Sequence, residues 1–402
     1  PRRAVFTEFI DAAGIAMDSG IVLFYPAPGS YTGEDVLELQ GHGGPVVLGL
    51  LLDRCVSLGA RVAEPGEFTR RAFLNGRMDL AQAEAVIDLI DAATGSAARS
   101  AMRSVSGEFS SKIHILESEL RDSRVLVEAT LDFPEEEVDE MHRDELRGRL
   151  EDLSRKLDGL LQVASQGSLL REGVHIVLAG LPNAGKSSLL NRLAGQELAI
   201  VTEIPGTTRD TIREVVDLGG VPAHIIDTAG LRSPRDPVEA IGVSRARAAA
   251  EKADFVLWIV DAAIPAAESA PEAQLPEGIP KVRVMNKIDL IGRSAGVEKH
   301  GTETVVWVSA KTGAGIDELR EALLQQLGWH GTGEGVFLAR ARHLESLRTA
   351  RERVGRACEQ LAHLELLADE LRLANDALGA IVGRTTPDQL LGEIFSRFCI
   401  GK

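Results

Sequence analysis

Apolar positions follow two different periods along this chain. From Asp79 to Gln166, and again after Gly331, apolar residues recur at steps of three and four with charged residues between them, which predicts amphipathic α-helices. Between residues 171 and 328, short apolar runs alternate with helical patterns, which is typical of a doubly wound parallel sheet. We therefore expect one helical domain built from two stretches of sequence, with a sheet-containing α/β domain inserted between them.

The first 75 residues have a third pattern. Short apolar runs such as Gly20–Tyr25 and Val36–Leu39 are separated by Gly and Pro, which predicts a small α+β domain. Within the first helical stretch, Asp132–Glu140 brings Pro134 and an acidic cluster, which we interpret as a solvated corner and helix start rather than a metal site. The predicted domains are residues 1–75, 76–170, 171–328 and 329–402, of which the second and the fourth are the two halves of the helical domain.

Composition narrows the class of protein. The chain of 402 residues is too long for a single core, and its formal net charge of −16 argues against a broad surface that grips nucleic-acid phosphates. Any RNA substrate would then need a local basic patch or a partner protein to hold it.

The three cysteines, Cys55, Cys358 and Cys399, are far apart and fit a reducing cytoplasm better than a disulfide framework or a zinc site. No apolar run approaches the roughly 18 residues of a membrane span.

A phosphate-binding loop occupies Gly180–Ser187, with the sequence Gly-Leu-Pro-Asn-Ala-Gly-Lys-Ser. The apolar run Val174–Gly180 leads into it as a buried strand should, and Lys186–Ala194 leaves it with helical periodicity. Main-chain N–H groups at the start of that helix can converge on phosphate oxygens, Lys186 can bridge the β- and γ-phosphates, and the Ser187 hydroxyl can bind Mg²⁺. A plain glycine-rich turn is the alternative, and the Lys-Ser pair argues against it.

Two later motifs indicate that the nucleotide is a guanine nucleotide. Asn286–Asp289 reads Asn-Lys-Ile-Asp and closes the apolar run Val282–Met285. The Asp289 carboxylate can accept hydrogen bonds from the ring N–H and the exocyclic amine of guanine, which adenine does not offer in that geometry, so GTP is favoured over ATP. Ser309–Lys311 is expected to supply the remaining wall of the base pocket, although alone it would be read as a polar turn.

The parts expected to act on the γ-phosphate lie between these motifs. Asp227–Gly230 follows another buried-strand pattern and can supply an acid near Mg²⁺ and a main-chain N–H for the γ-phosphate. Ras-like enzymes orient the attacking water with a glutamine at the next position, where this chain has Leu231. In Gly206–Asp210 we choose Thr208 as the second Mg²⁺ ligand after Ser187. The predicted nucleotide-binding residues are Asn183, Ala184, Gly185, Lys186, Ser187, Ser188, Thr207, Thr208, Asp227, Gly230, Asn286, Lys287, Asp289, Ser309, Ala310 and Lys311.

These motifs and the chain end Phe398–Lys402 together resemble the tRNA-modification GTPases of the MnmE (TrmE) family. Tyr31–Gly44 and Pro65–Asn75 are similar to the N-terminal domain of that family, and Gln166–Gly173 matches the start of its G domain. The resemblance implies a multidomain α+β and α/β protein. It would have an N-terminal folate-binding-like domain, a split helical domain and an inserted Ras-like P-loop G domain. The opening few dozen residues of the family have no counterpart here.

The resemblance also implies an activity and partners. The family hydrolyses GTP and, with the FAD-dependent partner MnmG, adds an aminomethyl-type group to the 5-position of the wobble uridine of certain tRNAs. The carbon comes from a tetrahydrofolate derivative, and the tRNA is held through the complex. The family forms a homodimer through the N-terminal domain and a transient G-domain dimer that depends on K⁺. A GTP switch of the ribosome-assembly type, without base modification, is the alternative, and a nucleotide-dependent dimerisation scaffold is a third reading.

Further site residues follow from the resemblance alone. Glu239 matches the residue that orients the hydrolytic water, and Cys399 is a catalytic candidate, although a lone cysteine between apolar neighbours is usually a small buried hydrophobe. The implied K⁺ ligands are Asn183, Thr202, Ile204 and Thr207. The implied folate-binding residues are Glu38, Arg77 and Lys402.

Overall fold

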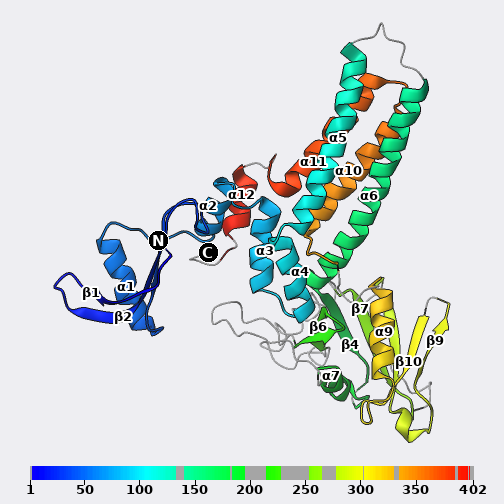
Figure 1. Ribbon diagram of the computed structural model, residues 1–402. Helices are drawn as coiled ribbons and strands as arrows, with labels where there is room; N and C mark the ends of the chain where they lie inside the picture. The colour runs from blue at the N-terminus through cyan, green and yellow to red at the C-terminus, as the bar shows by residue number, and fades with distance from the viewer. Residues whose placement is uncertain are drawn as a thin grey trace, which may run out of the picture. The chain divides into compact units, whose positions relative to one another are not determined.

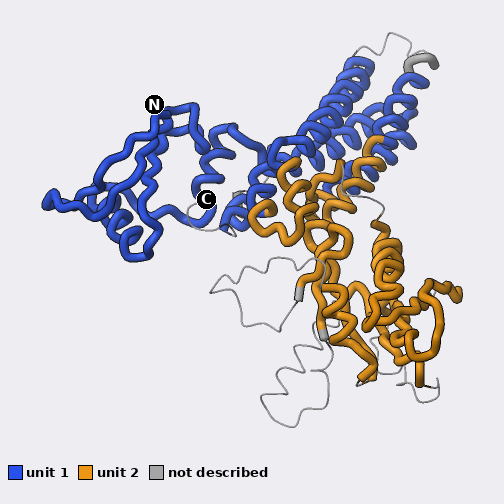
Figure 2. Tube along the Cα trace, turned by 60° about the horizontal axis from the view of Figure 1, so that its bottom comes forward, with its two compact units in different colours: residues 1–87, 104–155, 346–402 blue, residues 88–103, 156–345 orange. Residues whose placement is uncertain are grey.

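The computed structural model describes residues 2–132, 140–181, 183–194, 214–227, 253–264, 278–301, 303–329, 335–384, 388–396 and 398. The chain divides into two compact units (Figure 2). Unit 1 comprises residues 1–87, 104–155 and 346–402, and unit 2 comprises residues 88–103 and 156–345.

Unit 1 begins with a three-stranded antiparallel sheet in the order β1-β2-β3. Its strands are β1 (Val5–Ile10), β2 (Ala16–Tyr25) and β3 (Val36–Gln40), and the helices α1 (Pro45–Ser57) and α2 (Glu67–Leu74) follow. Gly20 is required where β2 approaches β3, because a Cβ atom there would lie 2.0 Å from the carbonyl oxygen of Gln40. Both apolar runs noted in this part of the sequence therefore lie in strands, as predicted.

The start of α2 holds a cluster of ionic hydrogen bonds around Glu67. Its carboxylate accepts hydrogen bonds from Arg61 Nη1 at 2.8 Å, from the Glu64 main-chain N–H at 2.9 Å and from Arg71 Nη2 at 2.8 Å. The hydrogen bond from Arg61, followed by those from Glu64 and Arg71, lowers the pKa of Glu67 from its usual value of 4.5 to about 2. The carboxylate is thus held in its charged form.

We expect this cluster to make the order of α2 depend on pH. Because the folded-state pKa of Glu67 is lowered, its stabilising contribution is present above about pH 4.5 and is lost as the pH falls towards 2. In Glu67→Gln, hydrogen exchange of the α2 amides should be faster than in the unchanged chain at pH 6, and the difference should vanish near pH 2. Glu64→Gln is the control, since only its main chain contacts Glu67. A difference that stays the same at every pH would contradict the expectation.

Long helices form the rest of unit 1 and continue into unit 2, and they confirm the helical pattern predicted from the sequence. They are α3 (Leu80–Ile90), α4 (Gly95–Val105), α5 (Glu108–Asp132), α6 (Glu140–Glu172), α10 (Ala341–Glu359), α11 (Leu364–Val382) and α12 (Asp388–Ser396). Within unit 1, α5 and α11 lie side by side (Figure 1). The inward positions of α5 are buried at the three- and four-residue steps seen in the sequence, as at Phe109, Ile113, Leu116 and Leu120.

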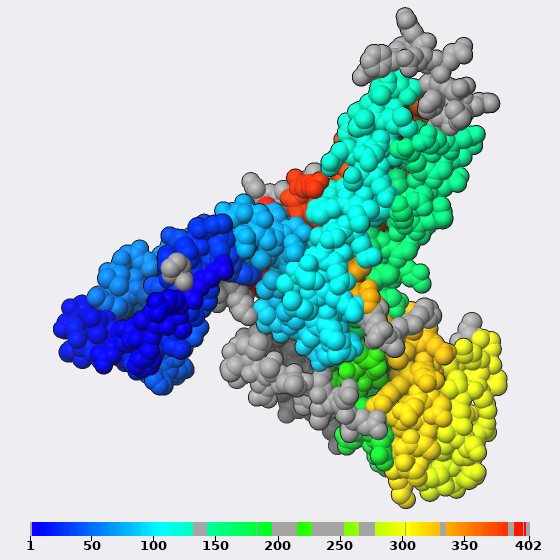
Figure 3. Space-filling view, viewed as in Figure 1, coloured from blue at the N-terminus to red at the C-terminus, as the bar shows by residue number. Residues whose placement is uncertain are grey.

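Unit 2 contains a seven-stranded sheet in the order β5-β6-β4-β7-β8-β10-β9. The strands are β4 (Val174–Ala179), β5 (Glu214–Leu218), β6 (Val221–Asp227), β7 (Phe255–Asp261), β8 (Lys281–Asn286), β9 (Gly296–His300) and β10 (Glu303–Trp307). The five inner strands are parallel, which confirms the parallel pairing expected of this region. The space-filling view shows the yellow residues of β9 and β10 at one edge of this unit (Figure 3).

The two edge strands differ from the parallel sheet expected from the sequence. β5 pairs with β6, and β9 pairs with β10, in the antiparallel direction. The physical reason is visible in the connection between β5 and β6, which is only Gly219–Gly220 with φ values of 59° and 98°. A two-residue turn with positive φ joins antiparallel strands, whereas parallel neighbours need a long crossover.

The core of unit 2 lies between the sheet and two helices, α7 (Lys186–Ala194) and α9 (Ile316–Gln326). Ile176 and Leu178 of β4 point to this side, where they join Leu189 of α7 and Leu319 of α9. The alternate residues of β4 belong to a separate apolar cluster with Ile226 and Val256. β4 is thus buried on both faces, as its continuous apolar run predicts.

Residues 88–103 are bound into unit 2 at two points. Asp88, only 8% exposed, accepts hydrogen bonds from Arg171 Nε at 2.9 Å and from Arg340 Nη2 at 2.8 Å. Thr94, just before α4, donates its hydroxyl hydrogen to the carbonyl oxygen of Gly220 at 2.7 Å. The end of α3 and the start of α4 are therefore attached to the structure that surrounds the sheet.

Candidate nucleotide-binding site

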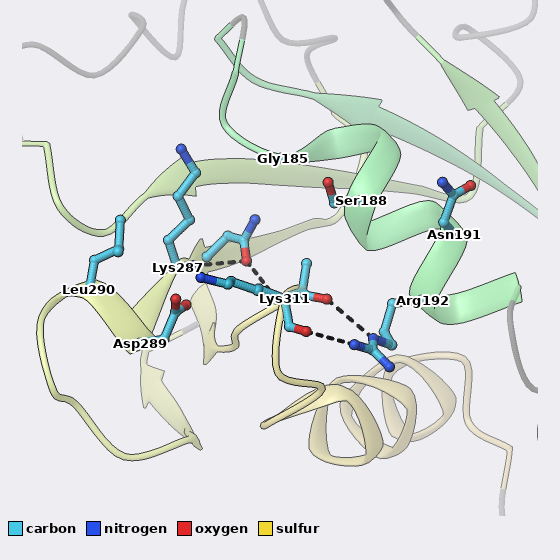
Figure 4. Close-up of a pocket in the computed structure, with 10 residues that line it drawn as sticks. Gly185, Ser188, Asn191, Arg192, Lys287, Asp289, Leu290 and Lys311 are labelled. Carbon is cyan, nitrogen blue, oxygen red and sulfur yellow. Dashed lines mark hydrogen bonds between the residues drawn. The ribbon is translucent and has the colours of Figure 1, made fainter.

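A pocket lies at the edge of the sheet where the parallel strands end. β4, β7, β8 and β10 are parallel, so the loops that follow them meet there. The pocket has a volume of about 630 Å³ (Figure 4). Its lining residues are Gly185, Ser188, Asn191, Arg192, Asn286, Lys287, Asp289, Leu290, Ala310 and Lys311. Seven of these are residues that the sequence predicted to bind nucleotide, and the structure brings them together.

The two glycines of the phosphate-binding loop are required by close contacts. Gly180 has φ 148°, and a Cβ atom there would lie 2.2 Å from the carbonyl oxygen of Ile259 on β7. Gly185 has φ 97°, and its Cβ atom would lie 2.3 Å from Nδ2 of Asn286. Any larger residue would push the loop away from the sheet or from Asn286, so the glycine spacing of the motif is a packing requirement here.

The loop and the helix that follows form a positively charged anion site. Lys186 Nζ donates hydrogen bonds to the carbonyl oxygens of Gly180 and Leu181, both at 3.0 Å, so the ammonium group lies against the loop. Ser187 and Ser188 are exposed in the first turn of α7. A helix N-terminus presents free N–H groups and the positive end of the helix dipole, which suits a phosphate.

Asn286 joins the phosphate loop to the loops expected to bind the base. It is 1% exposed, and its Nδ2 donates a hydrogen bond to the carbonyl oxygen of Ala184 at 2.9 Å. Its Oδ1 accepts hydrogen bonds from the main-chain N–H groups of Lys287 at 2.8 Å and Ala310 at 3.0 Å. One buried amide therefore fixes the relative positions of three loops at this edge.

Asp289 is held in orientation by the loop after β10. It lies in a short 3₁₀ helix, η4 (Ile288–Leu290), and its Oδ1 accepts a hydrogen bond from Ser309 Oγ at 2.6 Å. Ser309 is fully buried, and its Oγ also accepts the Thr312 main-chain N–H at 3.2 Å. A carboxylate with one oxygen fixed in this way is oriented to accept paired N–H donors such as those of guanine.

Lys287 is fixed at both its main chain and its side chain. Its backbone is left-handed, with φ 68° and ψ 35°. Its Nζ donates a hydrogen bond to Asp261 Oδ2 at 2.6 Å, and Asp261 Oδ1 accepts the Ala263 main-chain N–H at 3.0 Å. Burial acts to raise the pKa of Asp261, but the hydrogen bonds from Lys287 and Ala263 outweigh it and hold that pKa below its usual value.

Sequence reasoning missed Asp261, as well as Asn191, Arg192 and Leu290 in the pocket lining. A signal for Asp261 existed, because it is an acidic residue at the end of a buried strand pattern. A signal for Arg192 also existed, since it follows Ser188 by four positions and so lies on the same face of α7.

Several predicted residues lie outside the described residues. They are Thr202, Ile204, Thr207, Thr208, Gly230, Glu239, Cys399 and Lys402. Asp227 is described only through its backbone, as the last residue of β6. Where side chains are described, no group of three or more His, Cys, Asp and Glu residues is placed to hold a metal ion.

The two folate candidates that are described lie on different elements of unit 1. Glu38 is in β3, where its Oε2 accepts a hydrogen bond from Gln40 Nε2 at 3.4 Å. Arg77 follows α2, and its side-chain stem would be 3.2 Å from a Cβ atom at Gly33. Arg77 therefore packs against the turn that precedes β3. Within the described chain, no helix is long and apolar enough to span a membrane.

Comparison with known proteins agrees with this arrangement of motifs. A family model described as the MnmE helical domain matches residues 80–399, and one described as the GTP-binding protein TrmE N-terminus matches residues 1–77. A tRNA modification GTPase MnmE from Ralstonia nicotianae is 55% identical over 420 residues, which cover 100% of this chain and 89% of that protein. The protein of the same name from Laribacter hongkongensis is 56% identical over 408 residues, with coverage of 100% and 90%.

Among solved structures, the FeoB G domain from Methanococcus jannaschii is similar to part of the chain. It is 28% identical, covers 39% of this chain and 98% of that one, and has a TM-score of 0.28. The family matches by contrast extend over almost the full chain, on both sides of the pocket residues as well as through them. This chain belongs to the MnmE family of tRNA modification GTPases.

Proposed function

We propose that this chain hydrolyses GTP in the modification of tRNA. In the full reaction, an FAD-dependent partner, MnmG, would act with it to install an aminomethyl-type group at the 5-position of the wobble uridine, with a tetrahydrofolate derivative as the carbon source. The observation that carries the proposal is the Asn286 amide, which binds the phosphate loop and both base loops at once. The shared names of relatives more than half identical in sequence support the tRNA substrate.

The described residues suit both the phosphate end and the guanine end of GTP. The phosphates would bind at the start of α7, with Lys186 and the loop N–H groups as donors. The guanine would lie against Lys287 and the loop after β10, with Asp289 accepting its two N–H groups. Ser188, Arg192 and Leu290 also line the pocket between these ends.

Two cations fit the donor chemistry present. The Ser187 hydroxyl is exposed at the start of α7, as an Mg²⁺ ligand must be, and Thr208 would complete the protein ligands. Asn183 is exposed in the loop with φ 64°, and with Thr202, Ile204 and Thr207 it would supply oxygens for K⁺. When bound, such cations offset the charge that develops as the bond between the β- and γ-phosphates breaks. Glu239 is proposed to orient the attacking water, since Leu231 cannot.

Other partners are part of the proposal. From the family resemblance we also propose a homodimer through the N-terminal domain, a transient G-domain dimer and a cytoplasmic location. The proposed folate site comprises Glu38, Arg77 and Lys402. Cys399 is proposed as a catalytic residue of the modification step.

The proposal is tested by GTP hydrolysis and folate binding on the same preparation. We expect hydrolysis in K⁺ to exceed that in Na⁺ by at least about tenfold, because K⁺ offsets charge in the transition state. A formyl-tetrahydrofolate should bind at millimolar concentration or below. Hydrolysis without folate binding would favour a GTP switch that modifies no base, and hydrolysis equal in the two salts would contradict the role of K⁺.

A further inference from the structure

Arg192 connects the helix of the phosphate site to the loop of the base site. It lies on α7, one turn after Ser188, and its guanidinium group points to the loop after β10 (Figure 4). Its Nε donates a hydrogen bond to the carbonyl oxygen of Ala310 at 3.2 Å, and its Nη2 donates one to the carbonyl oxygen of Lys311 at 2.7 Å. These acceptors are 118 and 119 residues later in the sequence.

The loop that Arg192 contacts is held from two sides. On one side, Ser309 donates to Asp289 and the Ala310 N–H donates to Asn286, both of which belong to the predicted guanine motif. On the other side, the consecutive carbonyl groups of Ala310 and Lys311 point to α7 and are bound by Arg192. A planar guanidinium presents several donors in a fixed arrangement, which suits two neighbouring carbonyl oxygens better than a single ammonium group does.

We propose that Arg192 is a positioning residue that couples the phosphate site to the guanine site and slows release of the bound nucleotide. The inference rests on the proposed binding of guanine nucleotides. A nucleotide would touch α7 through its phosphates and the loop after β10 through its base, so separation of these two elements would break contacts at both ends of the nucleotide and speed its release. Arg192, an exposed residue of the pocket lining, links them directly, in addition to the buried connection through Asn286.

The chain offers a matched control for a purely structural role. Arg320 on α9 donates from Nη2 to the carbonyl oxygen of Leu193 at 3.1 Å, so it also binds α7 through an arginine and a main-chain carbonyl. Unlike Arg192, it is not among the residues that line the pocket. Loss of Arg320 should therefore loosen the same helix without loosening the base loop.

The test is stopped-flow release of a fluorescent GDP from the full chain, with melting temperature measured in parallel. We expect Arg192→Met to raise the dissociation rate about threefold to tenfold with little change in the association rate, because the hydrogen bonds from a charged donor that join α7 to the loop after β10 are lost. Arg192→Lys should recover part of the effect through one remaining hydrogen bond. Arg320→Met should lower the melting temperature and leave the dissociation rate within about twofold of the unchanged chain.

The outcomes separate this inference from the proposed function. If the unchanged chain does not bind the fluorescent GDP, the proposed function fails and this inference fails with it. If the unchanged chain binds the fluorescent GDP, but the dissociation rate of Arg192→Met is within about twofold of that of the unchanged chain, only the coupling role is wrong. Equal acceleration in Arg192→Met and Arg320→Met would also overturn it, since it would show a general loosening of α7.

Discussion

Asp289→Asn should reverse the preference of the pocket between guanine and xanthine nucleotides. We expect affinity for GTP to fall about 100-fold, because two hydrogen bonds to a charged acceptor are lost. Xanthine carries a carbonyl group where guanine carries its amine, and the new amide N–H₂ can donate to it. The substituted side chain would keep an oxygen that can accept the hydrogen bond now made by Ser309, so the loop should stay in place. Competition between GTP and XTP for a fluorescent GDP measures the reversal.

The control for this substitution is Asp317→Asn. Asp317 is an aspartate in the first turn of α9 whose side chain is 86% exposed, and it is not among the pocket residues. Its substitution removes the same charge from the same unit and should leave both affinities unchanged. The assignment of Asp289 as the base-reading residue would be wrong if its variant kept the original ratio of GTP to XTP affinity.

Asn286→Ala should destabilise unit 2 more than any other single change at the pocket. The substitution leaves the Ala184 carbonyl and the Ala310 N–H without the hydrogen bonds now made by a side chain that is only 1% exposed. A buried polar group left without its partner costs about 1–3 kcal/mol, so we expect a loss of roughly 2–5 kcal/mol in the local free energy of opening. Hydrogen exchange of β4, β8 and β10 without nucleotide measures this loss.

A second variant separates the two halves of the Asn286 amide. Asn286→Asp keeps oxygen acceptors for Lys287 and Ala310 but loses the donor to Ala184. We expect its hydrogen exchange near Ala310 to stay closer to that of the unchanged chain, while exchange in the phosphate loop increases. If Asn286→Ala exchanges as slowly as the unchanged chain throughout unit 2, the connection between the loops does not depend on this side chain.

The sequence predicted those parts of the fold whose signals are local. The apolar run of β4, the two glycines of the loop and the helical pattern of α7 are neighbours in the chain, so their order alone indicates the anion site. The antiparallel edge strands were missed, although Gly219–Gly220 gave a turn signal, because an alternating α/β pattern was extended over the whole region. Pairing direction depends on the length of each connection, which periodicity does not report.

The sequence motifs predicted which residues form the site, but not the contacts that hold those residues in place. Lys287 was identified from its motif, but nothing in a lysine indicates a left-handed backbone or an aspartate partner from another strand. The spacing from Ser188 indicated the face of α7 on which Arg192 lies, but not its partners, because these are main-chain carbonyls, which every residue has. Contacts of this kind arise only after the strands have been placed side by side.

The hydrogen bond of Thr94 links the movement of α4 to that of the sheet edge. Its hydroxyl donates a hydrogen bond to the turn between β5 and β6. A Cβ atom at Gly220 would lie 2.7 Å from Ser96 Oγ, so the turn and the start of α4 are in close contact. A displacement of the β5–β6 connection would break the hydrogen bond from Thr94 unless the first helical turn of α4 moved with it. The first turn of α4 would therefore move together with the edge of the sheet.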